Sequence, residues 1–292
     1  KPVPPEGWLQ PSPLEPVFRL GLAEEGAPAV DPAAIADGDL REHRLYARGA
    51  SDDKGPIWAH LRALELMDAA GMAPAVNVKL IFDGEEEIGS PFFGPFTEAH
   101  RDLLAADLVL VTDGPKHGSG RPTVSGGARG VLGLELTLEA ARRDVHSGNF
   151  VVPNPAWALN GLLASMAAPD GAPLIEGFEE DVARPSAAER EMMARIPVDL
   201  PALEKELGVR VPADYLERLM FHPTLNIRGL ASGFTGKQTN TIIPHRATVS
   251  IDVRMVKNQR LEKVYRRIID HIRAQGFAVI EGADAPLPDA LR

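Results

Sequence analysis

Apolar and polar positions follow two different patterns in the two halves of the chain. In the first half, residues 78–82 and 108–111 form short apolar runs, "VKLIF" and "LVLV", each followed by a turn containing Asp and Gly. Such runs are typical of strands buried on both faces, as in parallel sheets. Residues 56–71 repeat apolar positions at helical spacing, with proline near the start and glycine at the end. The first half therefore predicts an α/β layer.

The second half alternates apolar and polar residues, as a sheet with one exposed face does. The run "VLGLELTLEA" shows this at residues 131–140. The pattern predicts further strands at 224–231, 247–255 and 277–283, and helices at 154–166 and 261–276. We therefore expect two domains, at residues 1–124 and 125–292, the second an α+β domain with two strand–helix–strand units.

Charge and composition exclude several kinds of partner. The formal net charge of −10 disfavours nucleic acid and anionic membrane surfaces, which need a basic face. No apolar run approaches the roughly 18–20 residues that span a bilayer. The chain has no cysteine, which excludes disulfides and thiolate metal sites and leaves the compartment open. We take a cytoplasmic location as the default, with no nucleic-acid and no membrane partner.

Acidic residues gather where the predicted strands of the first half end. Asp52 and Asp53 follow one strand, Glu86 and Glu87 another, and Asp113 a third. The carboxyl ends of parallel strands meet at one edge of a sheet, so these carboxylates would converge there. Two divalent metal ions would neutralise several of them, and one glutamate would remain for proton transfer. The alternative for any single cluster is a solvated loop, but three such clusters favour a site.

Five motifs in order carry a resemblance to a known family. They are "LYARGASDDKGP", "FDGEEEIGS", "LVLVTDG", "RRDVHSGNF" and "TNTIIPHRATVSIDVR". Together they resemble the M20 metallopeptidase family, in its dipeptidase (carnosinase-like) branch. The resemblance implies a zinc-peptidase-like catalytic domain with a mostly parallel sheet, and an inserted α+β lid domain used for dimerisation.

The resemblance also implies roles for particular residues. Asp52 would bridge two divalent metal ions, with a cis peptide bond to Asp53. Glu87 and Asp113 would each bind one metal, and Glu86 would be the general base. Zinc is the expected metal, with manganese or cobalt as alternatives.

Other implied roles fall in the second half of the chain. His146 would reach the substrate and stabilise the oxyanion, and Arg254 would bind the carboxylate of the substrate, a task suited to a planar bidentate donor. Asn240 and Thr241 are weaker candidates for substrate contacts. A homodimer through the lid domain would let His146 act on the site of the partner chain.

One feature of the family pattern is missing. The family places an H-x-D motif on an early strand and a second histidine ligand near its C-terminus, and neither is in this sequence. We therefore expect a chain clipped at both ends, with residues 1–124 forming a truncated catalytic domain whose metals would each lack one histidine.

The expected function is hydrolysis of the amide bond of dipeptides, or similar small substrates, with a free C-terminal carboxylate. An alternative is the same chemistry on N-acyl amino acids. A further alternative is a non-catalytic fragment or degenerate homologue.

Overall fold

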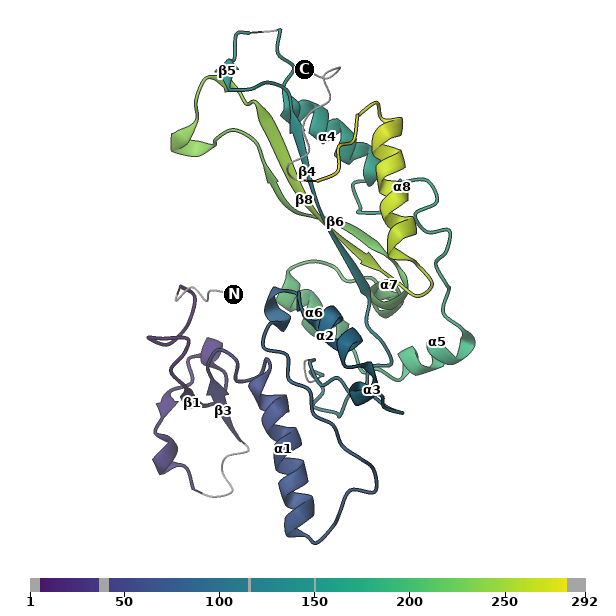
Figure 1. Ribbon diagram of the computed structural model, residues 1–292. Coiled ribbons are helices and arrows are strands. Elements are labelled where there is room, and N and C mark those ends of the chain that lie inside the picture. Colours follow the sequence, from purple (N-terminus) through teal and green to yellow (C-terminus); the bar gives the residue numbers. More distant parts are fainter. Residues whose placement is uncertain (1–5, 37–41, 115–116, 150, 283–292) are drawn as a thin grey trace. The chain divides into compact units, whose positions relative to one another are not determined.

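The computed structural model describes residues 6–36, 42–114, 117–149 and 151–282 (Figure 1). The chain divides into two compact units, residues 1–123 and 124–292. We describe each unit by itself. The assignment of a catalytic role to the first and a lid role to the second stays a prediction.

Unit 1 contains a small antiparallel sheet, one long helix and several short helices. The sheet has the strand order β2-β1-β3, with Phe18 opposite both Val30 and Leu45. The stretch predicted to be helical at 56–71 lies within the long helix α1 except for its last two residues, which form a turn. The elements are β1 (Val17–Leu20), η1 (Ala23–Glu25), β2 (Ala29–Val30), η2 (Pro32–Ala34), β3 (His43–Tyr46), α1 (Lys54–Ala69), η4 (Glu86–Ile88), α2 (Phe93–Ala99) and α3 (Arg101–Leu104).

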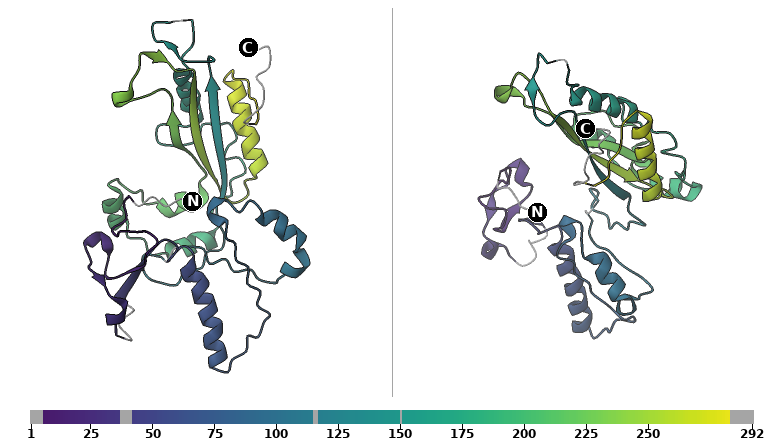
Figure 2. Two further views of the ribbon diagram at one scale, coloured as in Figure 1. Left: turned by 60° about the vertical axis from the view of Figure 1, so that its left-hand side comes forward. Right: turned by 45° about the horizontal axis from the view of Figure 1, so that its top comes forward.

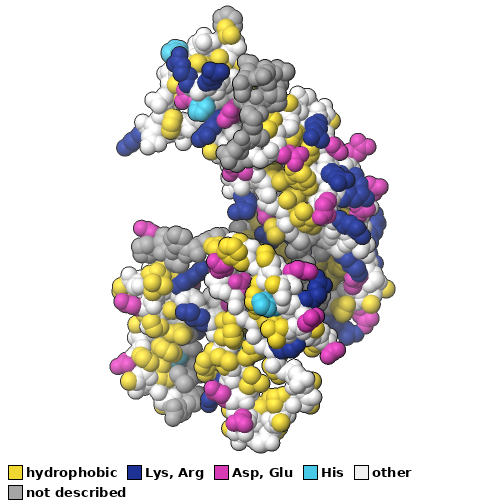
Figure 3. All heavy atoms as spheres, viewed as in Figure 1, with side chains coloured by type: hydrophobic (Ala, Val, Ile, Leu, Met, Phe, Trp, Pro, Cys, Tyr) yellow, Lys and Arg dark blue, Asp and Glu magenta, His cyan; other side chains and the backbone are white. Residues whose placement is uncertain are grey.

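The prediction of a mostly parallel sheet is wrong for the described residues. Every strand pair there is antiparallel, and the two apolar runs, 78–82 and 108–111, are irregular. A strand exists only where a neighbouring strand supplies hydrogen bonds, and no described strand pairs with either run. Both runs are exposed, with Leu110 at 74% and Val111 at 80%. Hydrophobic side chains accordingly cover much of the surface of unit 1 (Figure 3).

Unit 2 is built on a three-stranded antiparallel sheet with the order β4-β8-β6. A separate two-stranded ladder joins β5 to β7. The predicted strands at 131–140, 224–231 and 247–255 and the predicted helices at 154–166 and 261–276 are confirmed. The elements are β4 (Gly130–Glu139), β5 (Val145–His146), α4 (Pro155–Met166), α5 (Ala187–Ala194), α6 (Leu200–Leu207), α7 (Tyr215–Phe221), β6 (Thr224–Ala231), η5 (Gly236–Gln238), β7 (Ile242–Ile243), β8 (Arg246–Met255) and α8 (Leu261–Ala274).

The core of unit 2 lies between one face of this sheet and the helices α4 and α8, which both cover that face (Figure 2). Alternate residues of β8 point into it, and Val249, Ile251 and Val253 are fully buried. Leu159 and Ile268 meet them from the two helices. The opposite face of the sheet carries polar residues, as the alternating pattern predicts.

Two remaining expectations concern the end of the chain and the bilayer. The predicted strand at 277–283 is irregular at 277–282, and its last residue lies outside the described residues. Phe277 instead packs against the core of unit 2. Within the described ranges, none of the helices combines the length and the apolar character that crossing a bilayer requires.

Candidate active site

The first acidic turn joins β3 to α1 and is tightly folded. Gly49 has a φ of 79°, a conformation that favours glycine. A Cβ on Gly55 would stand 2.6 Å from the carbonyl oxygen of Ala50, so only glycine fits there without a shift of the backbone. The Asp52–Asp53 peptide bond is cis, as the resemblance implies. Asp52 is exposed, whereas Oδ1 of Asp53 is buried without a hydrogen-bond partner among the described residues.

The second acidic turn presents Glu86 to solvent at the start of η4. Asp83, which no sequence argument singled out, organises this turn. Its carboxylate accepts the hydroxyl of Ser90 and, at 2.8 Å, the backbone N–H of Glu85. These two bonds, the first more than the second, hold the pKa of Asp83 below its ordinary value. The Glu86 carboxylate forms no hydrogen bond or ion pair with another described residue.

An ion pair brings the first two acidic turns together. Arg48 Nη2 lies 2.5 Å from Glu87 Oε1, and the two side chains are 35% and 40% exposed. Arg48 belongs to the motif "LYARGASDDKGP", but its partner is 39 residues away. The sequence therefore gave no reason to link the two residues. The contact fixes Glu87 and leaves Glu86 beside it free.

The third acidic residue, Asp113, follows a contact with α1. Nε2 of His60 lies 2.8 Å from Oγ1 of Thr112, the residue immediately before Asp113. His60 lies in α1 and belongs to none of the five motifs. Because α1 starts directly after the first acidic turn, this hydrogen bond ties the third acidic segment to the same part of unit 1.

In unit 2, the ladder of β5 and β7 brings together the predicted substrate-contacting residues His146, Asn240 and Thr241. His146 is paired with Ile242, and the N–H of Ser147 donates to the carbonyl of Thr241 at 3.1 Å. Asn240 directly precedes this segment.

The ring of His146 also has a defined hydrogen-bond partner. The N–H of Gly148 donates to its Nδ1 at 3.1 Å. A ring nitrogen that accepts a hydrogen bond carries no proton, so neutral His146 carries its proton on Nε2. The exposed His146 can therefore donate a hydrogen bond through Nε2.

Arg254 lies near the end of β8, on the face of the sheet away from the core. Its Nε donates to Oδ2 of Asp252 at 2.8 Å. Asp252 is 8% exposed, a rare burial for a carboxylate, and its ion pair with Arg254 compensates for it. Arg129 lies close enough to both for its charge to interact with them. Burial, and then the positive charge of Arg254, lower the pKa of Arg129.

The predicted substrate residues of unit 2 lie at opposite ends of β8. The ladder of β5 and β7 adjoins His245, and Arg254 follows nine residues later in extended chain (Figure 1). At about 3.3 Å per residue, this separation is roughly 30 Å. His146 and Arg254 of one chain therefore cannot contact the same small substrate.

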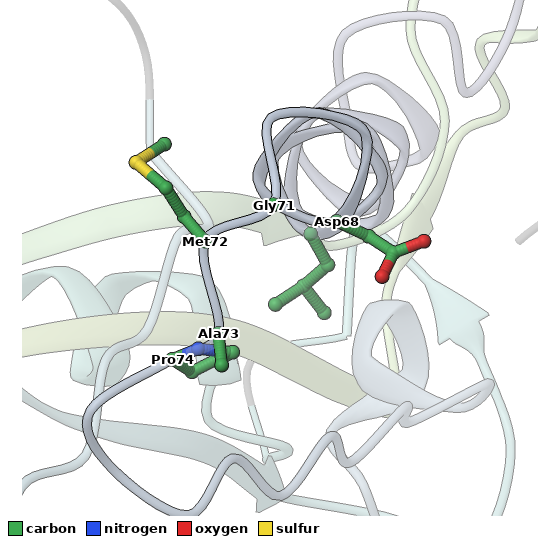
Figure 4. A pocket seen from close by; sticks show the side chains of 6 residues that line it. Asp68, Gly71, Met72, Ala73 and Pro74 are labelled. Carbon is green, nitrogen blue, oxygen red and sulfur yellow. The ribbon is translucent and has the colours of Figure 1, made fainter.

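A shallow hollow of unit 1 contains no predicted site residue. It lies at the C-terminal end of α1 (Figure 4). Asp68 contributes one carboxylate to its lining, and the other lining residues are apolar or glycine. It offers no group of polar side chains for chemistry. Its lining residues are Leu64, Asp68, Gly71, Met72, Ala73 and Pro74.

Comparison with family models decides the relationship that the motifs suggest. Residues 28–281 match the model of peptidase family M20/M25/M40. This match covers far more than half of the chain and spans both units. The chain belongs to peptidase family M20/M25/M40.

Within this family, the chain is similar to characterised dipeptidases. It is 29% identical over 261 residues to the Cys-Gly metallodipeptidase dug1 of Schizosaccharomyces pombe, covering 83% of this chain and 55% of the relative. It is 29% identical over 262 residues to the Beta-Ala-His dipeptidase of Rattus norvegicus, covering 84% and 53%. The chain thus spans about half the length of these M20 relatives.

A solved M20 structure has the same fold. The M20 family metallo-carboxypeptidase Sso-CP2 from Sulfolobus solfataricus matches with a TM-score of 0.75 and 36% identity. The match covers 84% of this chain and 56% of that one. The fold is thus a mixed α/β fold shared with M20 metallopeptidases.

Membership of the M20/M25/M40 family implies divalent metal ions, and unit 1 offers suitable ligands only in part. Its carboxylate oxygens suit such ions, and Oδ1 of Asp53 is buried without a hydrogen-bond partner among the described residues. Within the described ranges, however, no three His, Asp or Glu side chains come together as a metal site. The structure therefore connects the acidic turns but does not gather Asp52, Glu87 and Asp113 around one point.

Proposed function

We propose that this chain contributes to a metal-dependent hydrolase that cleaves the amide bond of dipeptides, or similar small substrates, with a free C-terminal carboxylate. The observation that carries the proposal is the second acidic turn, where Glu86 is exposed, without a hydrogen bond or ion pair to another described residue, beside the ion-paired Glu87. A carboxylate with this freedom can take up and release a proton. The names of the similar proteins, two dipeptidases and a carboxypeptidase, support the substrate class.

In this proposal the three acidic turns have distinct roles. Asp52, Glu87 and Asp113 would hold two divalent metal ions, zinc first, whose chemistry would be to polarise the substrate carbonyl and to acidify water. Glu86 takes a proton from the attacking water and returns it to the leaving amine. Because Arg48 neutralises Glu87 in this structure, we expect metal binding to loosen that ion pair.

The substrate would be held by unit 2. Arg254 binds the C-terminal carboxylate, and its fixed Nε leaves the two terminal nitrogens of the guanidinium group for a bidentate contact. His146 donates from Nε2 to the oxygen that becomes negative during attack. Asn240 and Thr241 would contact the substrate beside it.

We further propose a homodimer in which His146 serves the site of the partner chain. The separation of roughly 30 Å between the ends of β8 supports this, because one chain cannot apply His146 and Arg254 to one dipeptide. The free sheet edge also supports it. β8 is the central strand of the described sheet, and β4 lies at one of its edges. Long edges of this kind are normally covered.

A substrate panel tests the proposal. The full-length protein is assayed with zinc or manganese against dipeptides, their C-terminal amides and N-acyl amino acids. We expect hydrolysis of the dipeptides, loss of activity on the amides, and loss of activity with a chelator. Preference for N-acyl amino acids would assign the deacylase alternative, and the absence of turnover with metal bound would assign the non-catalytic one.

A cytoplasmic location stays a prediction.

A further inference from the structure

A side-chain clamp closes the base of the loop that carries His146. Oδ1 of Asp144 accepts two hydrogen bonds from one residue, at 2.7 Å from Nδ1 of His245 and at 2.9 Å from its backbone N–H. The carbonyl of His245 in turn accepts the N–H of Ala140 at 2.8 Å. The segment before β5 is thus tied, by backbone and side chain, to the segment between β7 and β8.

Beyond this clamp, the described part of the loop is held by a short ladder and by the hydrogen bond from the N–H of Ser147 to the carbonyl of Thr241. The ladder of β5 and β7 contains only two residue pairs, Val145 with Ile243 and His146 with Ile242. Short two-stranded ladders are marginal in water. Of these four residues, only Ile243 is buried. The clamp is therefore a substantial part of what fixes the direction of the exposed His146.

The chemistry of the clamp suits a permanent contact. The two hydrogen bonds from His245, side chain first, hold the pKa of Asp144 below its ordinary value. Asp144 is therefore ionised at neutral pH, and a charged acceptor makes stronger hydrogen bonds than a neutral one. His245 donates from Nδ1 whether its ring is neutral or protonated.

We propose that Asp144 and His245 are positioning residues that aim Nε2 of His146 at the substrate. The inference rests on the role proposed above for His146. The clamp itself touches no substrate and acts through the loop that it closes. Its loss would let the loop move, and displacement of a group that acts in the transition state lowers kcat more than it raises KM.

Kinetics of the full-length, metal-loaded protein provide the first test. We expect Asp144→Ala and His245→Ala to lower kcat by about 10- to 100-fold with KM changed by less than about threefold. His245→Asn should restore most of the activity, because the asparagine amide can donate from nearly the position of Nδ1. Asp170→Ala is the matched control, since Asp170 also accepts a backbone N–H, that of Ala172, in an exposed turn of unit 2. It should leave both constants unchanged.

Combination with His146→Ala separates positioning from general support of the fold. If the clamp acts through His146, Asp144→Ala should have less than about a twofold further effect in the His146→Ala background. If the losses of kcat in Asp144→Ala and His146→Ala multiply in the double variant, or if Asp144→Ala alone is fully active, the proposed positioning role is wrong. If His146→Ala alone is harmless, the proposed role of His146 fails and the inference fails with it.

A measurement without turnover covers the case in which the alanine variants fold poorly. The ¹⁵N chemical shifts of the His146 ring report its tautomer in the full-length protein. We expect the Nε2–H form in the wild type and in His245→Asn, and averaged shifts in His245→Gln, whose longer side chain does not place its amide at Nδ1. Identical shifts in all three proteins would contradict the clamp.

Discussion

Glu86 and Glu87 are neighbours in one short turn, yet their surroundings differ. Arg48 neutralises Glu87, whereas the carboxylate of Glu86 is exposed and forms no ion pair or hydrogen bond with another described residue. Two adjacent acids in different environments can take different parts in one reaction. The division into a ligand and a base therefore has a physical basis in this turn, with Asp83 as its support.

Glu86→Gln should abolish turnover and keep the metal. The amide cannot take a proton from water, and loss of a general base lowers kcat by about 10²- to 10⁴-fold. Metal content by elemental analysis should equal that of the wild type. Glu85→Gln, in the same turn, is the control and should be active. Near-normal kcat, or loss of metal from Glu86→Gln, would show that the roles of Glu86 and Glu87 are misassigned.

Gly55 and Gly161 both lie in helices and should respond oppositely to alanine. A Cβ on Gly161 meets nothing within 4 Å, so Gly161→Ala should stabilise the protein by about 0.5–1 kcal/mol. On Gly55 the Cβ would stand 2.6 Å from a backbone oxygen, and overpacking of this kind costs about 1–3 kcal/mol. Gly55→Ala should therefore lower the free energy of unfolding in urea, and also kcat, since Asp52 lies in the same turn. A stabilised and fully active Gly55→Ala protein would refute this account.

Sequence could predict the acidic residues but not the partners that hold them. The motifs single out Glu87 and His146. The contacts of Arg48 and His245 join residues that are 39 and 101 positions apart in the sequence, so they could be identified only in the structure. Such pairs depend on how the backbone folds between them. The predicted roles of all the site residues remain predictions: Asp52, Glu86, Glu87, Asp113, His146, Asn240, Thr241 and Arg254.

At the scale of elements, α5 shows how one carboxylate starts a helix. Ser186 caps it, with its hydroxyl accepting the N–H of Glu189, while the Glu189 carboxylate accepts the N–H and the hydroxyl of Ser186. These bonds, followed by Lys257, lower the pKa of Glu189 to about 2. Its contribution to stability is complete above the ordinary pKa of 4.5 and is lost as the pH falls toward about 2.

Glu189→Gln should therefore remove part of the acid sensitivity of the protein. Glutamine can still accept hydrogen bonds but cannot ionise. Between pH 5 and pH 3, the free energy of unfolding should fall less in Glu189→Gln than in the wild type. Glu206→Gln, in the exposed neighbouring helix α6, is the control and should follow the wild type. Parallel curves for Glu189→Gln and the wild type would contradict the capping role.

Two kinds of element could be predicted: helices, whose hydrogen bonds form within one segment, and strands that find a neighbouring strand to pair with. The helices α1, α4 and α8 carry helical periodicity, and β4 and β6 each pair with β8, so the positions of these elements follow from the sequence. The apolar runs at 78–82 and 108–111 have the composition of strands. They are irregular because a strand needs a neighbouring strand for its hydrogen bonds, and no described strand pairs with either run.

At the scale of the molecule, the proposal is of a site assembled from two chains. The proposed base lies in unit 1, and His146 and Arg254 lie at opposite ends of β8. If Arg254 serves one substrate, His146 of the same chain is roughly 30 Å away and must serve another. Oligomerisation would then be a condition for catalysis.

Mixing two inactive variants tests this arrangement. Glu86→Gln and His146→Ala chains are refolded together, so that mixed dimers form. In a mixed dimer one site has both groups intact, and activity should return to a substantial fraction of the wild type. Refolding each variant alone is the control. A strict sum of two inactive proteins, or a monomeric mass in solution, would refute the shared site.

If Arg254 binds the carboxylate of the substrate as proposed, its pairing with Asp252 also affects how tightly the substrate is held. An arginine side chain carries about 2 kcal/mol of rotamer entropy, which is lost when a ligand immobilises it. Here the hydrogen bond to a buried carboxylate has already ordered Arg254 during folding. The carboxylate of the proposed substrate would therefore meet a guanidinium group that one hydrogen bond already orients, and less of the binding energy would be spent on ordering it.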